Sequence, residues 1–135
     1  MFGEIYSGES EIHLTGKISL TQKDMHEFLL AKAAIAAGLT ILTKALSITL
    51  SGLNAVYIAG GFGNYINLDH VVDTGMIDFP TERIHKMGNT ALIGAKMFLF
   101  SGDSKTIETI LSGITHVNLE SDPDFQEIYV EKMLL

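Results

Sequence analysis

The sequence contains no cysteine, so this chain alone forms no disulfide, no thiolate metal site and no iron–sulfur cluster. Its 9 basic residues are outnumbered by 16 acidic ones and form no cluster, which argues against nucleic-acid binding. The longest apolar runs are interrupted by Lys32, Lys44 and Lys96, and the first residues lack the order of a signal peptide. We therefore expect a cytoplasmic protein that does not span a membrane.

Recognisable catalytic patterns are also missing. The sequence has no Walker loop with its lysine and no serine in a nucleophile elbow. The five histidines are scattered without metal-ligand spacing: His13, His26, His70, His85 and His116. With 135 residues, 47% of them apolar, the chain is long enough for one globular domain with a real core. The sequence thus predicts a folded domain with no catalytic residue and no metal site of its own.

The first third of the chain predicts a hairpin followed by a long helix. Residues 11–20 alternate polar and apolar side chains around Gly16, as a β-hairpin does. Thr21 is suited to cap a helix, with Asp24 completing a capping box. Residues 33–38 are alanine or glycine except for Ile35, and these small side chains would let another element pack close to the helix axis. The predicted buried stripe of this helix consists of Met25, Phe28, Leu29, Ile35, Leu39 and Leu42.

A glycine-rich bend after a short apolar strand is the main candidate for a functional site. Residues 56–59 read as a strand that is buried on both faces, and it runs into Gly60-Gly61-Phe62-Gly63-Asn64. Glycine permits positive φ angles and lets another group approach the backbone. Asn64 stands where it could cap the next helix, and such a turn can hold a nucleotide's phosphate or sugar. A tight strand-to-helix turn without a ligand is the alternative interpretation.

Lys32 is the second candidate, because it lies on or beside the apolar stripe of the long helix. In one interpretation its stem is buried and its ammonium group reaches water. In the other, the ammonium group stands at a cleft and binds a ribose hydroxyl or a phosphate oxygen.

The remaining segments alternate between helix and strand, which predicts an α/β or α+β layered domain. The expected elements are helices at 68–72, from Gly88-Asn89-Thr90 to about Leu99, at 104–112 and after Asp122-Pro123, and strands at 84–87 and 115–119. Asp122 is the expected cap of the last helix, with Pro123 at its first position. The helix that follows Gly88-Asn89 is apolar nearly all round, so we expect it to be buried in its own domain or against a partner.

Four blocks of sequence, in this order, resemble the C-terminal domain of the reductive activators of corrinoid proteins. The blocks are 18–38, 56–66, 88–95 and 122–127, and the resemblance runs from about Ile18 to the end of the chain. These activators are ATP-dependent iron–sulfur proteins, and the family resembles the wider class of actin, Hsp70 and sugar kinases. The resemblance implies a ribonuclease-H-like half of an ATPase domain over residues 18–135, preceded by an extended or hairpin segment at 1–17.

The resemblance also implies roles for particular residues. Gly60, Gly61, Phe62 and Gly63 would line the adenine and ribose site for ATP or ADP, with Asn64 capping the turn. Lys32 would lie near the ribose, since class members place a helix lysine there. The helix at 88–95 would cross its counterpart in the other half of the domain.

The sequence departs from the class pattern in ways that place magnesium binding and the iron–sulfur cluster on polypeptide outside this chain. The class binds phosphates and magnesium through aspartate-glycine hairpin turns, and none is found here. The missing N-terminal half would therefore hold magnesium, and the iron–sulfur cluster would belong to the parent protein. By this resemblance the parent reduces the cobalt(II) of a corrinoid protein partner to cobalt(I), and the chain is inactive by itself.

The sequence is also compatible with two other functions. The chain could be half of a related sugar or acyl kinase, or of a radical-dehydratase activator. It could also be a non-enzymatic module that forms a homodimer through Ala91, Gly94 and Ala95.

Overall fold

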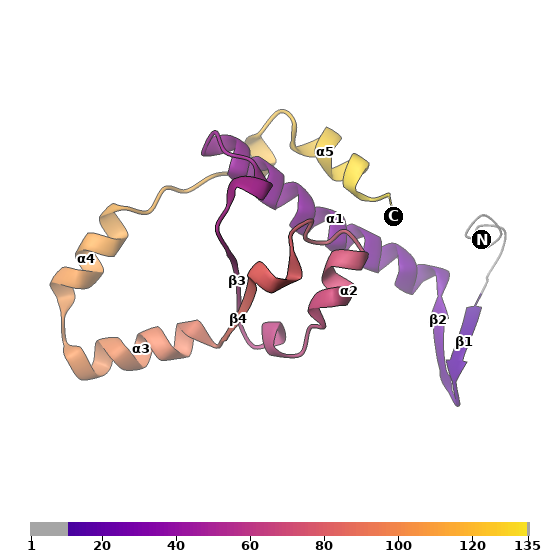
Figure 1. Ribbon diagram of the computed structural model, residues 1–135, viewed down its shortest axis with the longest axis horizontal. Helices are drawn as coiled ribbons and strands as arrows, with labels where there is room; N and C mark the ends of the chain where they lie inside the picture. The colour runs from indigo at the N-terminus through magenta and orange to yellow at the C-terminus, as the bar shows by residue number, and fades with distance from the viewer. Residues whose placement is uncertain (1–10, 135) are drawn as a thin grey trace.

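The computed structural model describes residues 11–134, so the first ten residues of the predicted N-terminal segment lie outside the described part. A β-hairpin is followed by alternating helices and strands, which confirms the α/β prediction. The elements are β1 (Glu11–Thr15), β2 (Ile18–Thr21), α1 (Gln22–Ala45), β3 (Val56–Ala59), α2 (Leu68–Asp73), β4 (Ile84–Gly88), α3 (Thr90–Ser101), α4 (Ser104–Ser112) and α5 (Phe125–Lys132), with short 3-10 turns between several of them. In Figure 1, α1 crosses the molecule diagonally, with the hairpin at one end and α3 and α4 standing apart on the other side.

The start of α1 is fixed by the predicted capping box. The Thr21 hydroxyl accepts a hydrogen bond from the Asp24 N–H at 3.2 Å, and the Asp24 carboxylate accepts one from the Thr21 N–H at 2.8 Å. The side-chain and backbone hydrogen bonds from Thr21 lower the pKa of Asp24 below its ordinary value. Donors that the helix leaves unpaired are thereby satisfied, and the helix begins at Gln22.

This pKa shift predicts how the cap depends on pH. Since the pKa of Asp24 is lower in the folded state, its ionised form stabilises the fold above the ordinary value of 3.8, and that contribution is lost as the pH falls through the folded pKa. Asp24→Ala should therefore lower the midpoint of thermal unfolding at neutral pH, with the difference from wild type narrowing in strong acid. Unfolding curves across the acid range test this, and a pH-independent difference would contradict it.

The buried face of α1 is made of small side chains. Ala33 and Ala37 are fully buried, and an added Cβ on Gly38 would lie 3.5 Å from Leu119 Cδ1. In Figure 1, α5 lies along this helix, and the two helices are in contact. The predicted close packing over residues 33–38 is thus confirmed. The predicted apolar stripe is wrong at Ile35 and Leu42, which are exposed, because the covering element is a helix that approaches over small residues.

Close packing predicts that this face does not tolerate larger side chains. Ala37→Leu should destabilise the domain by about 1–3 kcal/mol, because the added atoms have to displace α5. Ala34→Leu is the matched control, since Ala34 lies on the exposed side of the same helix. Chemical denaturation of both variants measures the difference, and equal stabilities would show that α5 does not seal this face.

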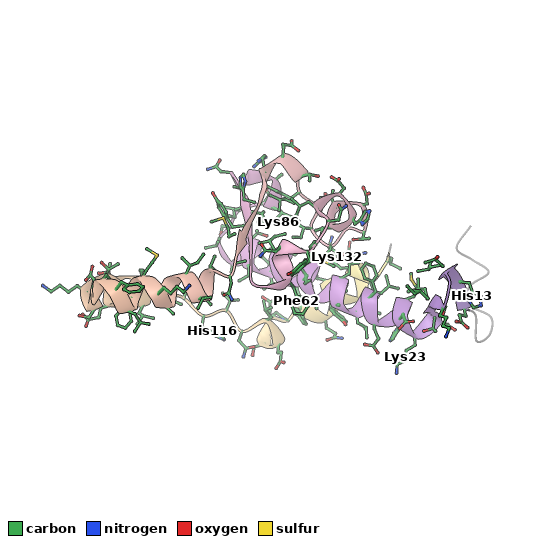
Figure 2. The ribbon with its side chains drawn as sticks, turned by 90° about the horizontal axis from the view of Figure 1, so that it is seen from below. His13, Lys23, Phe62, Lys86, His116 and Lys132 are labelled. Carbon is green, nitrogen blue, oxygen red and sulfur yellow. The ribbon has the colours of Figure 1, made fainter. Side chains whose placement is uncertain are left out.

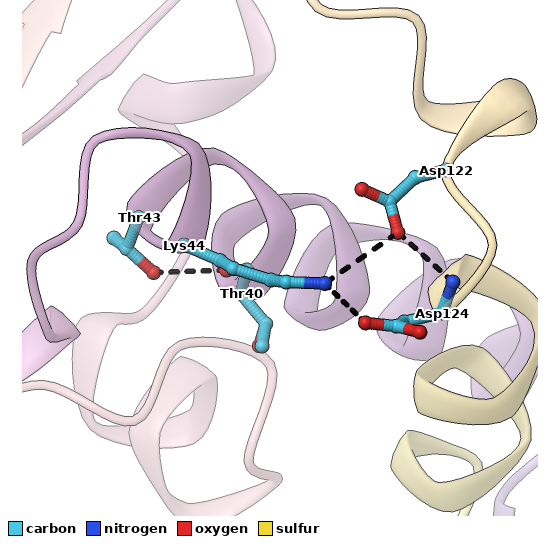
Figure 3. Close-up of polar contacts among 5 residues, drawn as sticks. All are labelled: Thr40, Thr43, Lys44, Asp122 and Asp124. Carbon is cyan, nitrogen blue, oxygen red and sulfur yellow. Dashed lines mark hydrogen bonds and ion pairs between the residues drawn. The ribbon is translucent and has the colours of Figure 1, made fainter.

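Both ends of α5 are held by lysines of α1. Near its first residues, Lys44 Nζ forms an ion pair and hydrogen bond with Asp124 and lies 3.9 Å from the Asp122 carboxylate (Figure 3). The hydrogen bond with Asp124 raises the pKa of Lys44. Beyond its last residues, Lys32 Nζ donates to the Leu134 carbonyl. The predicted cap at Asp122 is wrong, because α5 begins at Phe125 with Asp124 in the capping position.

By length and composition alone, α1 could also cross a membrane. Its small-residue face, however, is buried beneath α5, and Lys32 lies within that face. This is the arrangement of a core helix in a packed domain, and we interpret α1 as one.

The core lies between α1, α2 and one face of a parallel strand pair. β3 and β4 pair in parallel, and a segment containing α2 connects them. The central cluster consists of Val71, Ile77, Phe79 and Ile84, with Val56 and Ile58 of β3 packed against it. Tyr57, on the opposite face of β3, is 64% exposed, so the prediction of burial on both faces is wrong for the described residues. Parallel sheets are normally covered on both faces, and this open face indicates a layer that residues 11–134 do not supply.

The arm formed by α3 and α4 is not packed into this core. All side chains of α3 are exposed within the described chain, which contradicts burial in its own domain. The predicted strand at 115–119 is also absent: residues 114–118 form an irregular return from α4, followed by a short turn at Leu119–Ser121. No strand among residues 11–134 lies beside this segment, so its alternating pattern has no described partner to pair with. Burial of α3 against a partner stays a prediction.

Candidate functional site

Two glycines from the ends of neighbouring strands meet at the bend. Gly60 follows β3 with φ +106°, and its N–H donates to the carbonyl of Gly88 at 2.7 Å. Gly88, the last residue of β4, has φ +67°. Residues with a side chain rarely adopt such angles, so the backbone path at this corner depends on glycine.

The glycines of the bend differ in their surroundings. A Cβ added at Gly60 or Gly61 would have no heavy atom within 4 Å. A Cβ added at Gly63 would lie 2.9 Å from Ile58 Cγ2. Gly63 is therefore required by internal packing, whereas Gly60 and Gly61 present bare backbone to the surroundings.

The other residues of the bend expose their side chains. Phe62 is 89% exposed and Tyr65 is 90% exposed (Phe62 is labelled in Figure 2). Asn64 ends the 3-10 turn Phe62–Asn64, and its side-chain amide lies close to Gly88. The prediction that Asn64 caps the next helix is wrong, because Asn67 caps α2 by accepting from the N–H of Asp69 at 2.9 Å. The 3-10 turn Phe62–Asn64 comes before α2, which therefore begins only at Leu68, and Asn67 is its N-cap residue.

Lys32 does not reach water. Its side chain is almost completely buried, and its ammonium group donates to the Leu134 carbonyl near Gly75. Burial, followed by repulsion from Lys132, lowers the pKa of Lys32. The interpretation with a solvated ammonium group is therefore wrong. The contacts of Lys32 are not with the glycine bend, which lies on the side of α1 away from α5 in Figure 1, and a ribose contact stays a prediction.

The buried ammonium group predicts an unusual pH dependence. With the folded pKa of Lys32 below the unfolded value of 10.5, the unfolded chain binds more protons between the two values, so stability rises as the pH increases through that window. Lys32→Met removes the buried charge and should abolish this rise. Denaturation of wild type and variant from neutral to alkaline pH measures it, and parallel curves would contradict the prediction.

Sequence reasoning missed Lys86 as a neighbour of the bend. Lys86 lies opposite Ile58 in the β3–β4 register, and its Nζ donates to the Asn64 carbonyl at 3.4 Å. The signal that could have found it is the pairing of the two predicted strands, which brings the end of the second strand beside the bend.

An apolar groove separates α3 from α4. It has a volume of about 810 Å³ and is lined mainly by apolar side chains, with Gly94 at its wall: Met97, Phe98, Phe100, Ile107, Ile110 and Leu111. Within residues 11–134, no three acidic or histidine side chains converge as metal ligands would. The described part of the chain therefore offers bare backbone, an exposed aromatic ring and an apolar groove.

Comparison with known proteins identifies the family. Residues 4–135 match the model of the C-terminal domain of RACo, the ASKHA domain. A relative, the corrinoid activation enzyme RamQ of Eubacterium limosum, is 36% identical over 115 residues, which cover 84% of this chain and 19% of the relative. The chain thus spans about a fifth of the length of that relative. The predicted resemblance is confirmed, and the chain belongs to the family of C-terminal ASKHA domains of RACo.

Proposed function

We propose that this chain is the adenine-nucleotide-binding half of a cytoplasmic, ATP-dependent activator that reduces the cobalt(II) of a corrinoid protein to cobalt(I). The single observation that carries the proposal is the open corner at Gly60 and Gly61, where side-chain-free backbone follows the strand of an ASKHA domain. The name of the RamQ relative supports corrinoid activation as the output. In the wider class this corner contacts the adenosine.

In this proposal, the chain binds the adenosine part of the nucleotide, and polypeptide outside it binds the magnesium and the iron–sulfur cluster. Gly60, Gly61, Phe62, Gly63 and Asn64 would form one wall of the adenine and ribose pocket. No three acidic or histidine side chains converge among residues 11–134, and in this proposal the missing N-terminal half binds magnesium and the terminal phosphates. Without cysteine, the iron–sulfur cluster of the parent has no ligands in this chain.

The uncovered surfaces support a missing half. The outer face of β3 and the arm of α3 and α4 expose apolar side chains that soluble proteins normally cover. The missing half of the ATPase domain is the proposed cover. Nucleotide binding between the halves would shift the activator between states with different affinity for the corrinoid protein.

Nucleotide binding by the intact activator, with both halves present, tests the proposal. Gly61→Asp places a carboxylate at the open corner and should weaken ATP and ADP binding at least about tenfold, or about 1.4 kcal/mol. Titration calorimetry measures the affinity, and the unfolding midpoint without nucleotide serves as the control for folding. An unchanged affinity would remove the bend from the site.

A homodimer through the exposed face of α3 is the second candidate, because that face is uncovered in the described chain. Sedimentation of wild type and Ala95→Leu measures the oligomeric state and distinguishes the homodimer from the nucleotide-binding half. If a dimer forms and dissociates on this substitution, the non-enzymatic module gains support. A related sugar kinase would instead phosphorylate a sugar. A radical-dehydratase activator would show no response to a corrinoid protein.

A further inference from the structure

Lys86 stands at the rim of the glycine bend. It lies on β4, two residues before Gly88, whose carbonyl accepts the N–H of Gly60. The ammonium group bonds the Asn64 carbonyl, which belongs to the bend itself. Figure 2 labels Lys86, which belongs to β4, and Phe62, which belongs to the bend.

The ammonium group of Lys86 is free to bind another acceptor. A lysine has three N–H donors, and the bond to Asn64 is a long one at 3.4 Å. The residue is exposed, so its charge has not lost its hydration. Lys32 differs on each point, since its ammonium group is buried and bonded to the Leu134 carbonyl.

The bend residues themselves, Gly60 to Asn64, carry no positive charge for an anionic ligand. Gly60 and Gly61 offer backbone, and Phe62 offers an aromatic face suited to a base. The chain as a whole carries a formal charge of -7, which repels phosphate. A cation at the corner would offset that repulsion locally, where Lys86 stands.

We propose that Lys86 binds a phosphate oxygen of the adenine nucleotide held at the glycine bend. This inference rests on the proposed function and adds a binding residue that the resemblance does not supply. The lysine would hold the phosphate nearest the ribose, while the bare backbone of Gly60 and Gly61 admits the sugar.

The test compares ADP with adenosine on the intact activator. Lys86→Gln should weaken ADP binding about tenfold, the usual worth of one hydrogen bond to a charged group, and leave adenosine binding unchanged. Lys86→Arg should retain most of the ADP affinity. Lys23→Gln is the matched control for loss of one positive charge and should bind ADP as wild type does, because Lys23 is exposed in the first turn of α1 and lies away from Phe62 in Figure 2.

Each other outcome overturns the inference in a recognisable way. Unchanged ADP affinity in Lys86→Gln removes Lys86 from the site while the proposed function stands. An equal loss of ADP and adenosine indicates a structural effect on the bend and also overturns the phosphate contact. If wild type binds neither ligand, the proposed function fails and this inference fails with it.

Discussion

Gly63→Ala is expected to destabilise the domain by about 1–3 kcal/mol, whereas Gly61→Ala, two residues earlier, leaves it as stable or slightly more so. The added Cβ at Gly63 would lie 2.9 Å from Ile58 Cγ2 and 3.4 Å from the Ile58 carbonyl oxygen. Ile58 is β-branched, belongs to β3 and packs against the core, so it cannot yield without disturbing the strand.

Gly61 accepts a Cβ for clear reasons. Its φ of -59° and ψ of -41° suit alanine, and no heavy atom lies within 4 Å of the added carbon. Replacing glycine by alanine at a compatible position stabilises a protein by about 0.4–1 kcal/mol through the unfolded chain. The new methyl group would nonetheless occupy the corner where the proposed nucleotide approaches.

The pair of variants therefore separates folding from binding. Thermal or chemical unfolding of both should show the loss at Gly63 alone, and calorimetry with ADP should show weaker binding for Gly61→Ala. If Gly61→Ala binds ADP like wild type, the open corner is not part of a nucleotide site. If both variants are equally stable, the contact between Gly63 and Ile58 does not constrain the bend.

Local sequence signals predicted the elements whose partners lie close in the chain. The hairpin around Gly16 and the capping box of Thr21 and Asp24 both formed as expected, because each depends on residues within a few positions. The apolar strand ending at Ala59 also appears where its composition indicates.

The errors concern which neighbour covers an element. Ile35 is exposed although its spacing suits a core helix, because α5, almost a hundred residues further on, selects the alanine face of α1. The segment 115–119 alternates like a strand, but none of the strands that the structure describes lies beside it. Lys86 lies beside the bend because of the register between β3 and β4, and no local sequence pattern encodes that register.

At the candidate site, the sequence identified the bend but not the different roles of its glycines. The sequence alone does not distinguish the roles of the three glycines in these four positions. Only the position of Ile58 makes Gly63 a packing residue and leaves Gly61 open. Likewise, Lys32 and Lys86 carry the same charge, and burial beneath the end of α5 distinguishes them.

The open face of the sheet and the uncovered arm have one physical explanation. A two-stranded parallel pair and an all-round apolar helix are both unstable arrangements in water unless another layer covers them. The alignment to a fifth of a longer relative is consistent with a covering layer elsewhere in such a protein. The arm would then be an internal surface of the complete protein.

If the arm is internal, a charge placed in its groove should strongly destabilise the complete protein. Leu111→Asp sets a carboxylate on the apolar groove between α3 and α4, where Leu111 is 61% exposed in the described chain. Buried against the missing half without a partner charge, that carboxylate should cost about 3–5 kcal/mol. Thr109→Asp introduces the same charge on the same helix outside the groove lining and should cost little.

Unfolding of the complete protein, followed with and without nucleotide, measures the stability of both variants. A large loss for Leu111→Asp beside a small one for Thr109→Asp would mean that the groove is covered in the complete protein, because an exposed carboxylate remains hydrated and costs almost nothing. Equal, small losses would mean that the groove faces water there too, and the missing half would then have to bind elsewhere, on the open face of β3.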